Sequence, residues 1–311
     1  MRPEAAPDAA SPRTSLPRPA GSTPELLLLA NAKASSLSSG DDLVGAAERA
    51  LRARGAQVER RLTHSLDELR DVIAGVEGRV VLLGGDGTVH AVANLPGPAP
   101  QLALLPAGRA NNVARSLGIP TELADAAALA VDGAARSIDV IEARTETRRY
   151  RVVEGVSVGF HARARVNYQA ENSAALGRGL AVGLGALWKF RPLSVVLEGD
   201  GERNVVTVGQ LFAANLPLYG FGLRVAPSAD PTDGLLDLVT IGARTRRAVV
   251  AMIPRIRNGT HVGHSDVGMR QIRSVRIDPG GASPVIADST DLGSGAVELT
   301  VEPGALRMVT P

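Results

Sequence analysis

Short apolar runs alternate with amphipathic stretches along the first half of the chain. ELLLLANA, RVVLLGG and QLALLPAG are nearly continuous apolar runs, which is typical of buried strands, and QVERRLT is a further strand-like run. Between them, DDLVGAAERALRARG and SLDELRDVIAG place apolar residues three or four positions apart, as helices with one buried face do. Two more helices are expected, from about Val89 and from about Asn111. This alternation predicts a parallel sheet with helices on both faces.

The pattern changes after about Ser137, where strand-like runs separated by Gly, Pro and Asp dominate. These runs are IDVIEART, RRYRVVEGVSVGF, LSVVLEG, VVTVGQLFAANL, GLLDLVTIG, RSVRIDPG, SPVIADS and AVELTVEPGALRMV, with helical character in ARARVNYQAENSAALGRGLAVGLGALWKF and TRRAVVAMIPRIRNG. We predict an α/β domain at residues 25–138 and a β-rich, sandwich-like domain at 139–303, with 304–311 returning to the first domain. Residues 1–24 are rich in Pro, Ala and Ser and are expected to be a disordered tail.

Composition narrows the possible functions. The chain carries 34 Lys and Arg against 32 Asp and Glu, a net charge of +2, so a nucleic-acid partner has no electrostatic support and is not expected. Cysteine is absent, which excludes thiolate metal sites and thiol nucleophiles. No apolar run approaches the roughly 18 residues that would span a bilayer, and the N-terminus lacks the apolar core of a signal peptide. We expect a cytoplasmic protein.

A glycine turn that carries an acid follows one of the buried strands, in VVLLGGDGTVHAVANL from Val80 to Leu95. Its glycines let the backbone turn tightly and approach a ligand, and amides at a helix start can hold phosphate oxygens. Asp86 would then bind magnesium or assist proton removal from an attacking hydroxyl. In the simpler alternative, Asp86 only caps the helix.

The next strand ends in a similar turn. LLPAGRANNVARSLGIP again places a glycine turn before a helix start that is rich in hydrogen-bonding side chains. Ligands of parallel α/β sheets bind at the carboxyl ends of the strands. Two such turns on successive strands therefore predict a phosphate-binding cleft.

These motifs resemble those of the diacylglycerol kinase catalytic-domain family of lipid kinases, which is related to sphingosine kinases and more remotely to NAD kinases. LLLLANAKASS is similar to the family's first strand and nucleotide loop, and GVSVGFHARA, FAANLPLYGFGLRVAPSADPTDGLLDLVTI and EPGALRMVTP follow the family's order. The resemblance implies an NAD kinase-like nucleotide-binding domain, with ATP and Mg²⁺ as cofactors. The nucleotide-contacting residues that it implies are Asn31, Ala32, Lys33, Ser35, Thr63, Gly84, Gly85, Asp86, Gly87, Thr88, His90, Gly108, Arg109 and Asn111.

The resemblance also implies a metal site and partners. The turn before GLLDLV is similar to the family's structural magnesium site, which suggests the carboxylate of Asp233 with Asp230 and the Leu235 carbonyl nearby. The implied acceptor is a lipid, diacylglycerol by default, and a homodimer is left open. ALGRGLAVGLGALWKF has cations at its edges and would line an acyl chain or touch an anionic membrane transiently at the inner face; the alternative is a core-packing helix.

The nucleotide loop that begins at Asn31 keeps the family's Asn-Pro-x-Ser-Gly only in part, and two further motifs depart from the family pattern. The family's Gly-Thr-x-Asn-Asp is here Gly108-Arg-Ala-Asn-Asn112, so a nucleotide-contacting Thr has become Arg109 and an acid has become the amide Asn112. The other is PVIADSTDLG, where the family has Asp-Gly-Glu and uses the Glu as a catalytic base. Alignment puts Asp288 at the Asp and Thr290 at the Glu, and a threonine cannot be a base near neutral pH.

Two interpretations follow from the second departure. Asp86 is our first catalytic candidate, with Asp288 or Asp291 assisting. If no acid assists it, the chain is a catalytically silent relative that binds nucleotide or lipid as a regulator. An unrelated alternative is a hydrolase, because Gly155-Val-Ser-Val-Gly159 fits the nucleophile-elbow pattern, with Ser157, an Asp from the 230s and His261 or His264 in hydrolase order.

Overall fold

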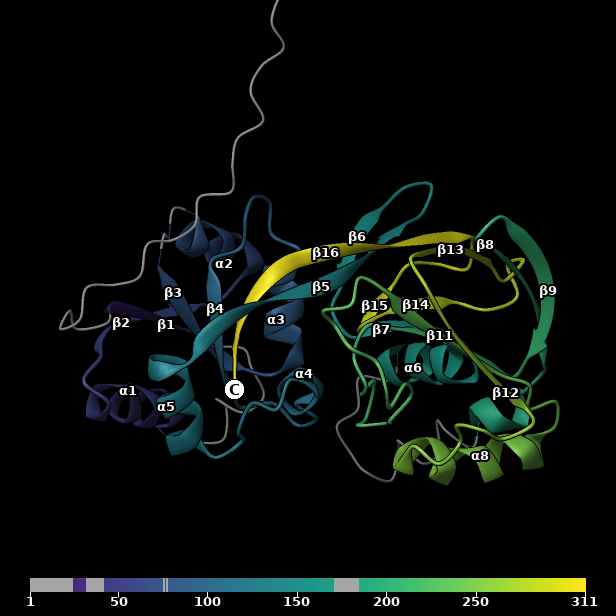
Figure 1. The fold of residues 1–311 in the computed structure, drawn as a ribbon, viewed down its shortest axis with the longest axis horizontal. Coiled ribbons are helices and arrows are strands. Elements are labelled where there is room, and N and C mark those ends of the chain that lie inside the picture. The colour runs from purple at the N-terminus through teal and green to yellow at the C-terminus, as the bar shows by residue number, and fades with distance from the viewer. Residues whose placement is uncertain (1–24, 32–41, 75, 77, 171–184) are drawn as a thin grey trace, which may run out of the picture.

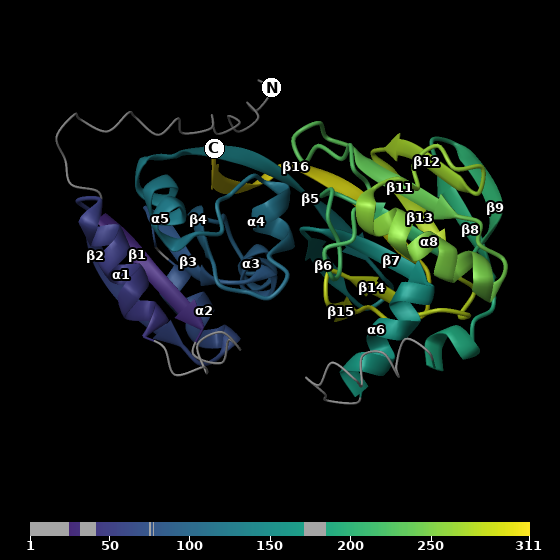
Figure 2. The ribbon, with the colours of Figure 1, turned by 90° about the horizontal axis from the view of Figure 1, so that it is seen from below.

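The computed structural model describes residues 25–31, 42–74, 76, 78–170 and 185–311. Two domains lie side by side, and one long sheet runs through both (Figures 1 and 2). The strand order in this sheet is β2-β1-β3-β4-β16-β13-β8-β9, with β5 paired to β16 and β6 paired to β5. A second sheet, β12-β11-β10-β7-β14-β15, belongs to the second domain. The predicted fold class, an α/β domain followed by a β-rich domain, is confirmed.

The first domain is built on four parallel strands. They are β1 (Glu25–Asn31), β2 (Gln57–Thr63), β3 (Arg79–Gly84) and β4 (Gln101–Pro106). Helices α1 (Leu43–Ala53) and α5 (Leu123–Asp132) pack on one face, and α2 (Leu66–Ile73), α3 (Asp86–Ala93) and α4 (Asn112–Ser116) pack on the other. Because both faces are covered, the central strands β3 and β4 are almost entirely apolar.

The second domain is a sandwich. Its strands are β5 (Ala134–Arg144), β6 (Arg149–Val152), β7 (Gly155–Gly159), β8 (Leu193–Gly199), β9 (Glu202–Val208), β10 (Gln210–Ala214), β11 (Leu236–Ile241), β12 (Val267–Ile272), β13 (Ser274–Asp278), β14 (Val285–Ala287), β15 (Thr290–Asp291) and β16 (Val297–Thr310). Apolar side chains of the two sheets form the core between them. Helix α8 (Arg246–Asn258) packs on the outer side of the six-stranded sheet, and α6 (Phe160–Ala170) follows β7.

Strand β16 ties the two domains together. Its first half pairs with β13, and its second half pairs with β4 at Arg307 and Met308, so the last strand ends inside the first domain's sheet (Figure 1). Strand β5 runs antiparallel to β16 along both halves, with an irregularity between Glu302 and Leu306. The two domains therefore share a continuous hydrogen-bonded ribbon.

The structure differs from the sequence-based expectations at several elements. Helix α3 begins at Asp86 rather than near Val89, and α5 and β12 were not predicted. The run RRYRVVEGVSVGF was taken as a single strand, but it forms β6 and β7 with a break at Val153 and Glu154. This break turns Glu154 away from a regular strand and towards the first domain.

Asp139 holds the ribbon to the second domain. This carboxylate is 3 % exposed and accepts hydrogen bonds from the backbone amides of Gly304 (2.7 Å) and Gly234 (2.8 Å). We expect Asp139→Ala to lower the free energy of unfolding by about 3 kcal/mol, because two buried amides lose a charged acceptor. Urea denaturation measures this loss. Asp132→Ala, which removes an exposed carboxylate, is the control and should change stability by less than about 0.5 kcal/mol.

Candidate active site

The two glycine turns lie against each other at the carboxyl ends of β3 and β4. The amide of Ala107 donates to the carbonyl of Gly84 (2.8 Å). A Cβ at Gly85 would lie 2.8 Å from the Cα of Gly108, and a Cβ at Gly108 would lie 2.6 Å from the Cα of Gly85. Only glycine permits this backbone-to-backbone contact, which explains why both turns need one.

The start of α3 is the exposed part of this site. A Cβ added at Gly87 would meet no atom of the described residues within 4 Å, so among these residues the space above the first helical turn is open. Thr88 follows, and its amide donates to the carbonyl of Gly85 (3.0 Å). Asp86 is the first helical residue, and its Oδ1 accepts a hydrogen bond from the amide of Val113 (2.9 Å), at the start of α4. Asp86 therefore links the two turns rather than capping its own helix.

The remaining nucleotide candidates lie at the same sheet edge or outside the described residues. Asn31 and Thr63 are paired at the ends of β1 and β2, and Thr63 is buried. Asn111, at φ 49°, closes its own loop, because its Oδ1 accepts from the amide of Gly108 (2.9 Å) and its Nδ2 donates to the Gly108 carbonyl (3.0 Å). Arg109 is exposed beside them. The candidates Ala32, Lys33 and Ser35 lie outside the described residues.

Behind the glycine turns, a buried polar cluster joins the two domains. His90 of α3 places Nε2 3.0 Å from Oε1 of Glu154 and 3.7 Å from Oδ2 of Asp288. Asn112 of α4 donates from Nδ2 to Oε2 of Glu154 (2.8 Å) and to the carbonyl of Gly220 (2.6 Å). Neither ring nitrogen of His90 has a well-aligned hydrogen bond among the described residues, so charge attraction at short range carries its contacts.

The charges of this cluster depend on one another. Burial favours neutral His90, but the carboxylates of Asp288 and Glu154 outweigh it and raise the pKa of His90 to about 9. Burial raises the pKa of Glu154 to about 7, although the His90 cation partly offsets this effect. At neutral pH the cluster therefore combines a histidine cation with a carboxyl group that is close to its titration point.

Of the two assisting acids that the sequence suggested, one is buried in backbone contacts and one is exposed. Asp288, at φ 50°, accepts from the amides of Val153 (3.0 Å), Glu154 (2.8 Å) and Gly155 (3.3 Å), so its carboxylate anchors the β6–β7 break. Asp291 is exposed, and its carboxylate accepts from the amide of Gly293 (2.8 Å) in its own turn. The acid nearest to His90 is Glu154, at 3.0 Å, and Asp288 lies 3.7 Å away.

The sequence-based prediction did not include Glu154, because this residue lies at none of the positions that the family motifs mark. The available signal was a lone acid inside the apolar run RRYRVVEGVSVGF, directly before a glycine. An unpaired buried carboxylate is costly, so such an acid indicates either a strand break or a polar partner from elsewhere in the fold. In this structure it marks both.

The turn proposed for structural magnesium is closed by its own hydrogen bonds. Asp230 Oδ1 accepts from the hydroxyl (2.7 Å) and amide (3.0 Å) of Thr232. Asp233 accepts from the Leu235 amide at Oδ1 (2.8 Å) and from Gln271 Nε2 at Oδ2 (3.0 Å). No group of three or more acidic or histidine side chains in the described ranges is arranged to hold a metal ion. The magnesium site at this turn stays a prediction from the sequence.

The hydrolase pattern has no triad behind it. Ser157 is fully buried, and its Oγ lies 3.1 Å from Nδ1 of His161, the second residue of α6. His261 lies elsewhere, with Nε2 3.0 Å from the carbonyl of Val225. Because Ser157 is buried and His261 lies elsewhere, we interpret the Gly155–Gly159 pattern as part of a strand without a catalytic role.

Two family models match the chain. The diacylglycerol kinase catalytic domain matches residues 25–143, and the YegS C-terminal NAD kinase beta sandwich-like domain matches residues 154–310. A diacylglycerol kinase of Mycobacterium tuberculosis is 29% identical over 271 residues, covering 84% of this chain and 87% of that protein. A Pseudomonas fluorescens protein named "probable lipid kinase YegS-like" is 30% identical over 280 residues, covering 86% and 90%.

Solved structures share the fold. A diacylglycerol kinase from Bacillus anthracis superposes with a TM-score of 0.67 at 19% identity, covering 92% of this chain and 97% of that one. An NAD kinase from Archaeoglobus fulgidus, solved in complex with ATP, superposes with a TM-score of 0.54 at 14% identity, covering 92% and 93%. At these identities the likeness concerns the fold alone.

Proposed function

The chain belongs to the family of bacterial diacylglycerol kinases and YegS-like lipid kinases, and from this membership we propose that it transfers the γ-phosphoryl group of ATP to a lipid hydroxyl. Diacylglycerol is the proposed acceptor, since the Mycobacterium tuberculosis relative bears that name. ATP is the proposed donor, and the NAD kinase with the same fold was solved with ATP bound.

One observation carries the proposal: the glycine turns with Asp86 between them. Contact of Gly85 with Gly108 brings two turns together, and the open space above Gly87 lies at the start of an eight-residue helix. Phosphate groups bind at helix N-termini, where free amides and the helix dipole favour negative charge. We assign the ATP phosphates to this space, with Arg109 at its exposed rim neutralising charge.

Asp86 would act on the acceptor. The lipid hydroxyl oxygen attacks the γ-phosphorus, the bond from that phosphorus to the β–γ bridging oxygen breaks, and ADP leaves with the electron pair. The Asp86 carboxylate takes the hydroxyl proton, and its hydrogen bond to Val113 orients it for this step. ATP would enter as its magnesium complex. Asp291 is left out of the proposed catalytic set because its carboxylate is exposed in another turn.

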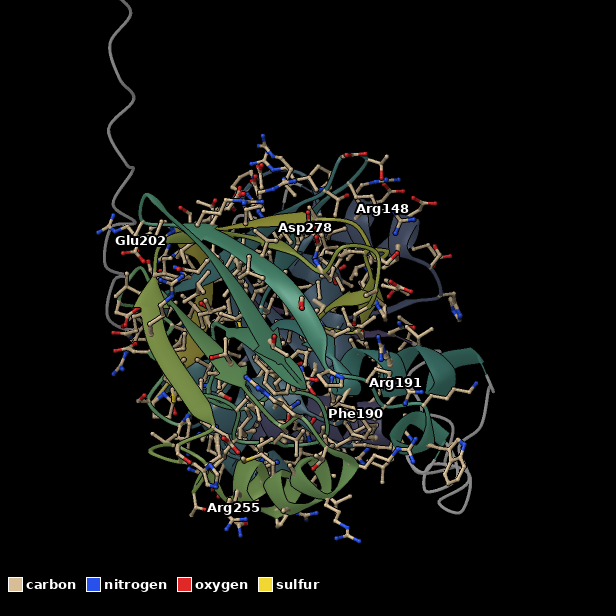
Figure 3. All side chains as sticks on the ribbon, turned by 90° about the vertical axis from the view of Figure 1, so that its right-hand side faces the viewer. Arg148, Phe190, Arg191, Glu202, Arg255 and Asp278 are labelled. Atoms are coloured by element: carbon tan, nitrogen blue, oxygen red, sulfur yellow. The ribbon has the colours of Figure 1, made fainter. Side chains whose placement is uncertain are left out.

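A basic face of the second domain supports transient membrane contact. Exposed apolar side chains, Trp188 (74 %), Val250 (48 %) and Ile253 (43 %), stand among cations. Residues 185–193 and 243–263 contain no acid and include Lys189, Arg191, Arg244, Arg246, Arg247, Arg255 and Arg257. Figure 3 shows Arg191 and Arg255 in the lower half of the view, and the acidic Glu202 and Asp278 in the upper half. Such a surface suits anionic lipid at the inner membrane face.

No described helix is long and apolar enough to cross a membrane. Residues 171–184, including Arg178 of the ALGRGLAVGLGALWKF segment, lie outside the described residues. At the segment's end, Ala186 and Phe190 are buried and Trp188 is exposed, which combines the core-packing and surface interpretations. The homodimer stays a prediction.

The alternative function is a silent relative that binds nucleotide or lipid as a regulator, and Thr290 at the usual base position favours it. Radiolabelled ATP with vesicles of diacylglycerol in anionic phospholipid separates the two. We expect labelled lipid that depends on both protein and Mg²⁺. ATP binding by calorimetry without transfer to diacylglycerol or to a panel of other lipids would establish the silent alternative.

The nucleotide position can be tested in the same assay with Gly87→Ala. The added methyl meets no atom in the part of the chain that the structure describes, so folding should be unchanged, but it would fill the space assigned to the phosphates. We expect the KM for ATP to rise roughly tenfold, equivalent to about 1.4 kcal/mol of binding. Gly78→Ala is the matched control. Its methyl also has no atom of the described residues within 4 Å, and Gly78 lies before β3, at the other end of the strand from the glycine turn. An unchanged KM would move the phosphates away from Gly87.

A further inference from the structure

An acid of the second domain contacts an amide of the first domain that stands where the family motif has an acid. Asn112 stands where the family motif has an acid, and Glu154, 42 positions later in the second domain, contacts it at 2.8 Å. Asn112 is 1% exposed and Glu154 is 4% exposed, so water does not screen the contact. The negative charge that the first domain lacks is therefore present at this point, supplied by the second domain.

The contact also reaches Asp86 through the next residue. Asn112 is held at its side chain by Glu154, and Val113 is held at its amide by Asp86. Both residues belong to the first turn of α4. The same carboxylate lies 3.0 Å from His90, which is one turn after Asp86 on α3. Glu154 thus holds both helices that flank the proposed catalytic carboxylate.

We propose that Glu154 is a positioning residue for phosphoryl transfer, and that it replaces from the second domain the carboxylate lost at Asn112. This inference rests on the proposed function. The pair works because it is one acid and one amide. Two carboxylates at 2.8 Å would repel each other, and two amides would leave the His90 cation with Asp288 as its nearest counter-charge.

The ionisation of Glu154 gives this role a signature. The charged groups that act on it are Asp86 and His90 from α3 and Asp288 from the β14–β15 turn, and Glu154 in turn acts on the hydroxyls of Tyr150 and Tyr219. Burial raises the pKa of Glu154 to about 7, so its charge changes near neutrality. The ionised form attracts His90 and accepts from Asn112, so activity should fall as the pH falls through about 7. A neutral glutamine has no such dependence.

An isosteric charge exchange tests the proposal. We would compare wild type, E154Q, N112D and the double variant N112D/E154Q, with E198Q at an exposed ion pair as the control. E154Q should lower kcat roughly 100-fold, as expected for a misplaced catalytic group, change the KM for ATP by less than about threefold, and remove the acidic limb of the kcat profile near pH 7. N112D restores the family's residue, yet it should also lower kcat because it sets two carboxylates together.

The double variant again pairs one acid with one amide. We expect it to recover kcat by roughly tenfold over N112D. Recovery stays partial because the Gly220 carbonyl loses its donor. A kcat of E154Q within threefold of wild type would overturn the proposal, and so would a double variant whose loss equals the product of the two single losses. An N112D protein that folds only when E154Q is added supports the pairing.

Failure of this inference can be told from failure of the proposed function. If wild type transfers no phosphate to any lipid, the proposed function fails, while thermal unfolding of the same four proteins still tests the pair. If the losses in Tm are coupled, so that the double variant melts above N112D, Asn112 and Glu154 are a structural pair without a catalytic role. Additive losses in Tm overturn the pairing as well.

Discussion

Replacing Asp86 with asparagine is expected to lower the rate of phosphoryl transfer to lipid by roughly 1,000-fold without unfolding the protein. The amide oxygen can still accept the hydrogen bond from Val113, so the link between the two glycine turns survives. What disappears is the negative charge that takes the hydroxyl proton. Steady-state rates with radiolabelled ATP, together with the melting temperature, measure the two effects separately.

Asp67→Asn is the matched control for this experiment. Asp67 also lies in the first turn of a helix, but its carboxylate is exposed and pairs with Arg70 on the surface. Its replacement should leave the transfer rate within about twofold, because an exposed ion pair contributes little. Transfer by Asp86→Asn at a rate close to that of wild type would remove Asp86 from the chemical step.

The second large effect concerns the stability of the buried cluster. The folded protein raises the pKa of His90 from 6.5 to about 9, so it binds this proton more tightly than the unfolded chain does. The resulting stabilisation is fully present below about pH 6.5 and is lost as the pH rises through 9. A rise of this size corresponds to about 3 kcal/mol. Wild type should therefore become less stable between pH 7 and 9.5.

His90→Gln tests this linkage in urea denaturation at several pH values. At pH 7 we expect a loss of about 3 kcal/mol, because Glu154 and Asp288 lose their buried counter-charge. Between pH 7 and 9.5 the variant should show a much flatter profile than wild type. Glu154 titrates mainly below this window, since burial raises its pKa from 4.5 to about 7. An equally steep decline in the variant would contradict the assignment.

His64→Gln is the control for the histidine experiment. His64 is exposed at the end of β2, so its replacement should leave both the stability at pH 7 and the pH profile unchanged. A decline above pH 7 that is common to wild type and both variants would come from groups other than His90.

Much of the first domain could be predicted from local pattern. The apolar runs of β1, β3 and β4 reflect strands that are buried on both faces. The amphipathic spacing in α1 and α2 reflects helices that are buried on one face. The start of α3 could not be predicted as well, because Gly85 lets the backbone enter the helix directly after the strand. Helix α5 is rich in alanine, so its apolar periodicity is weak.

The proposed positioning residue, Glu154, was harder to predict, because the sequence marks it only as a lone acid in an apolar run. Alignment with the family's Asp-Gly-Glu motif pointed to Asp288, Thr290 and Asp291, which lie in one turn of the second domain. In the folded protein, the Asp288 carboxylate accepts hydrogen bonds from backbone amides, and Asp291 is exposed to solvent. Glu154 has no motif around it, and it becomes part of the site through a break between two strands and the packing of one domain on another.

Near neighbours along the chain encode strand periods, turn residues and helix starts, so the two-domain fold, the glycine turns at successive strand ends and the position of Asp86 could be predicted without a structure. Which side chains meet behind Asp86 depends instead on how the two domains pack. Asn112 and Glu154 are far apart in the chain, and their 2.8 Å contact depends on how the shared ribbon of β5 and β16 sets the domains together. Such contacts follow from packing across an interface between domains, and the spacing of residues along the chain does not predict them.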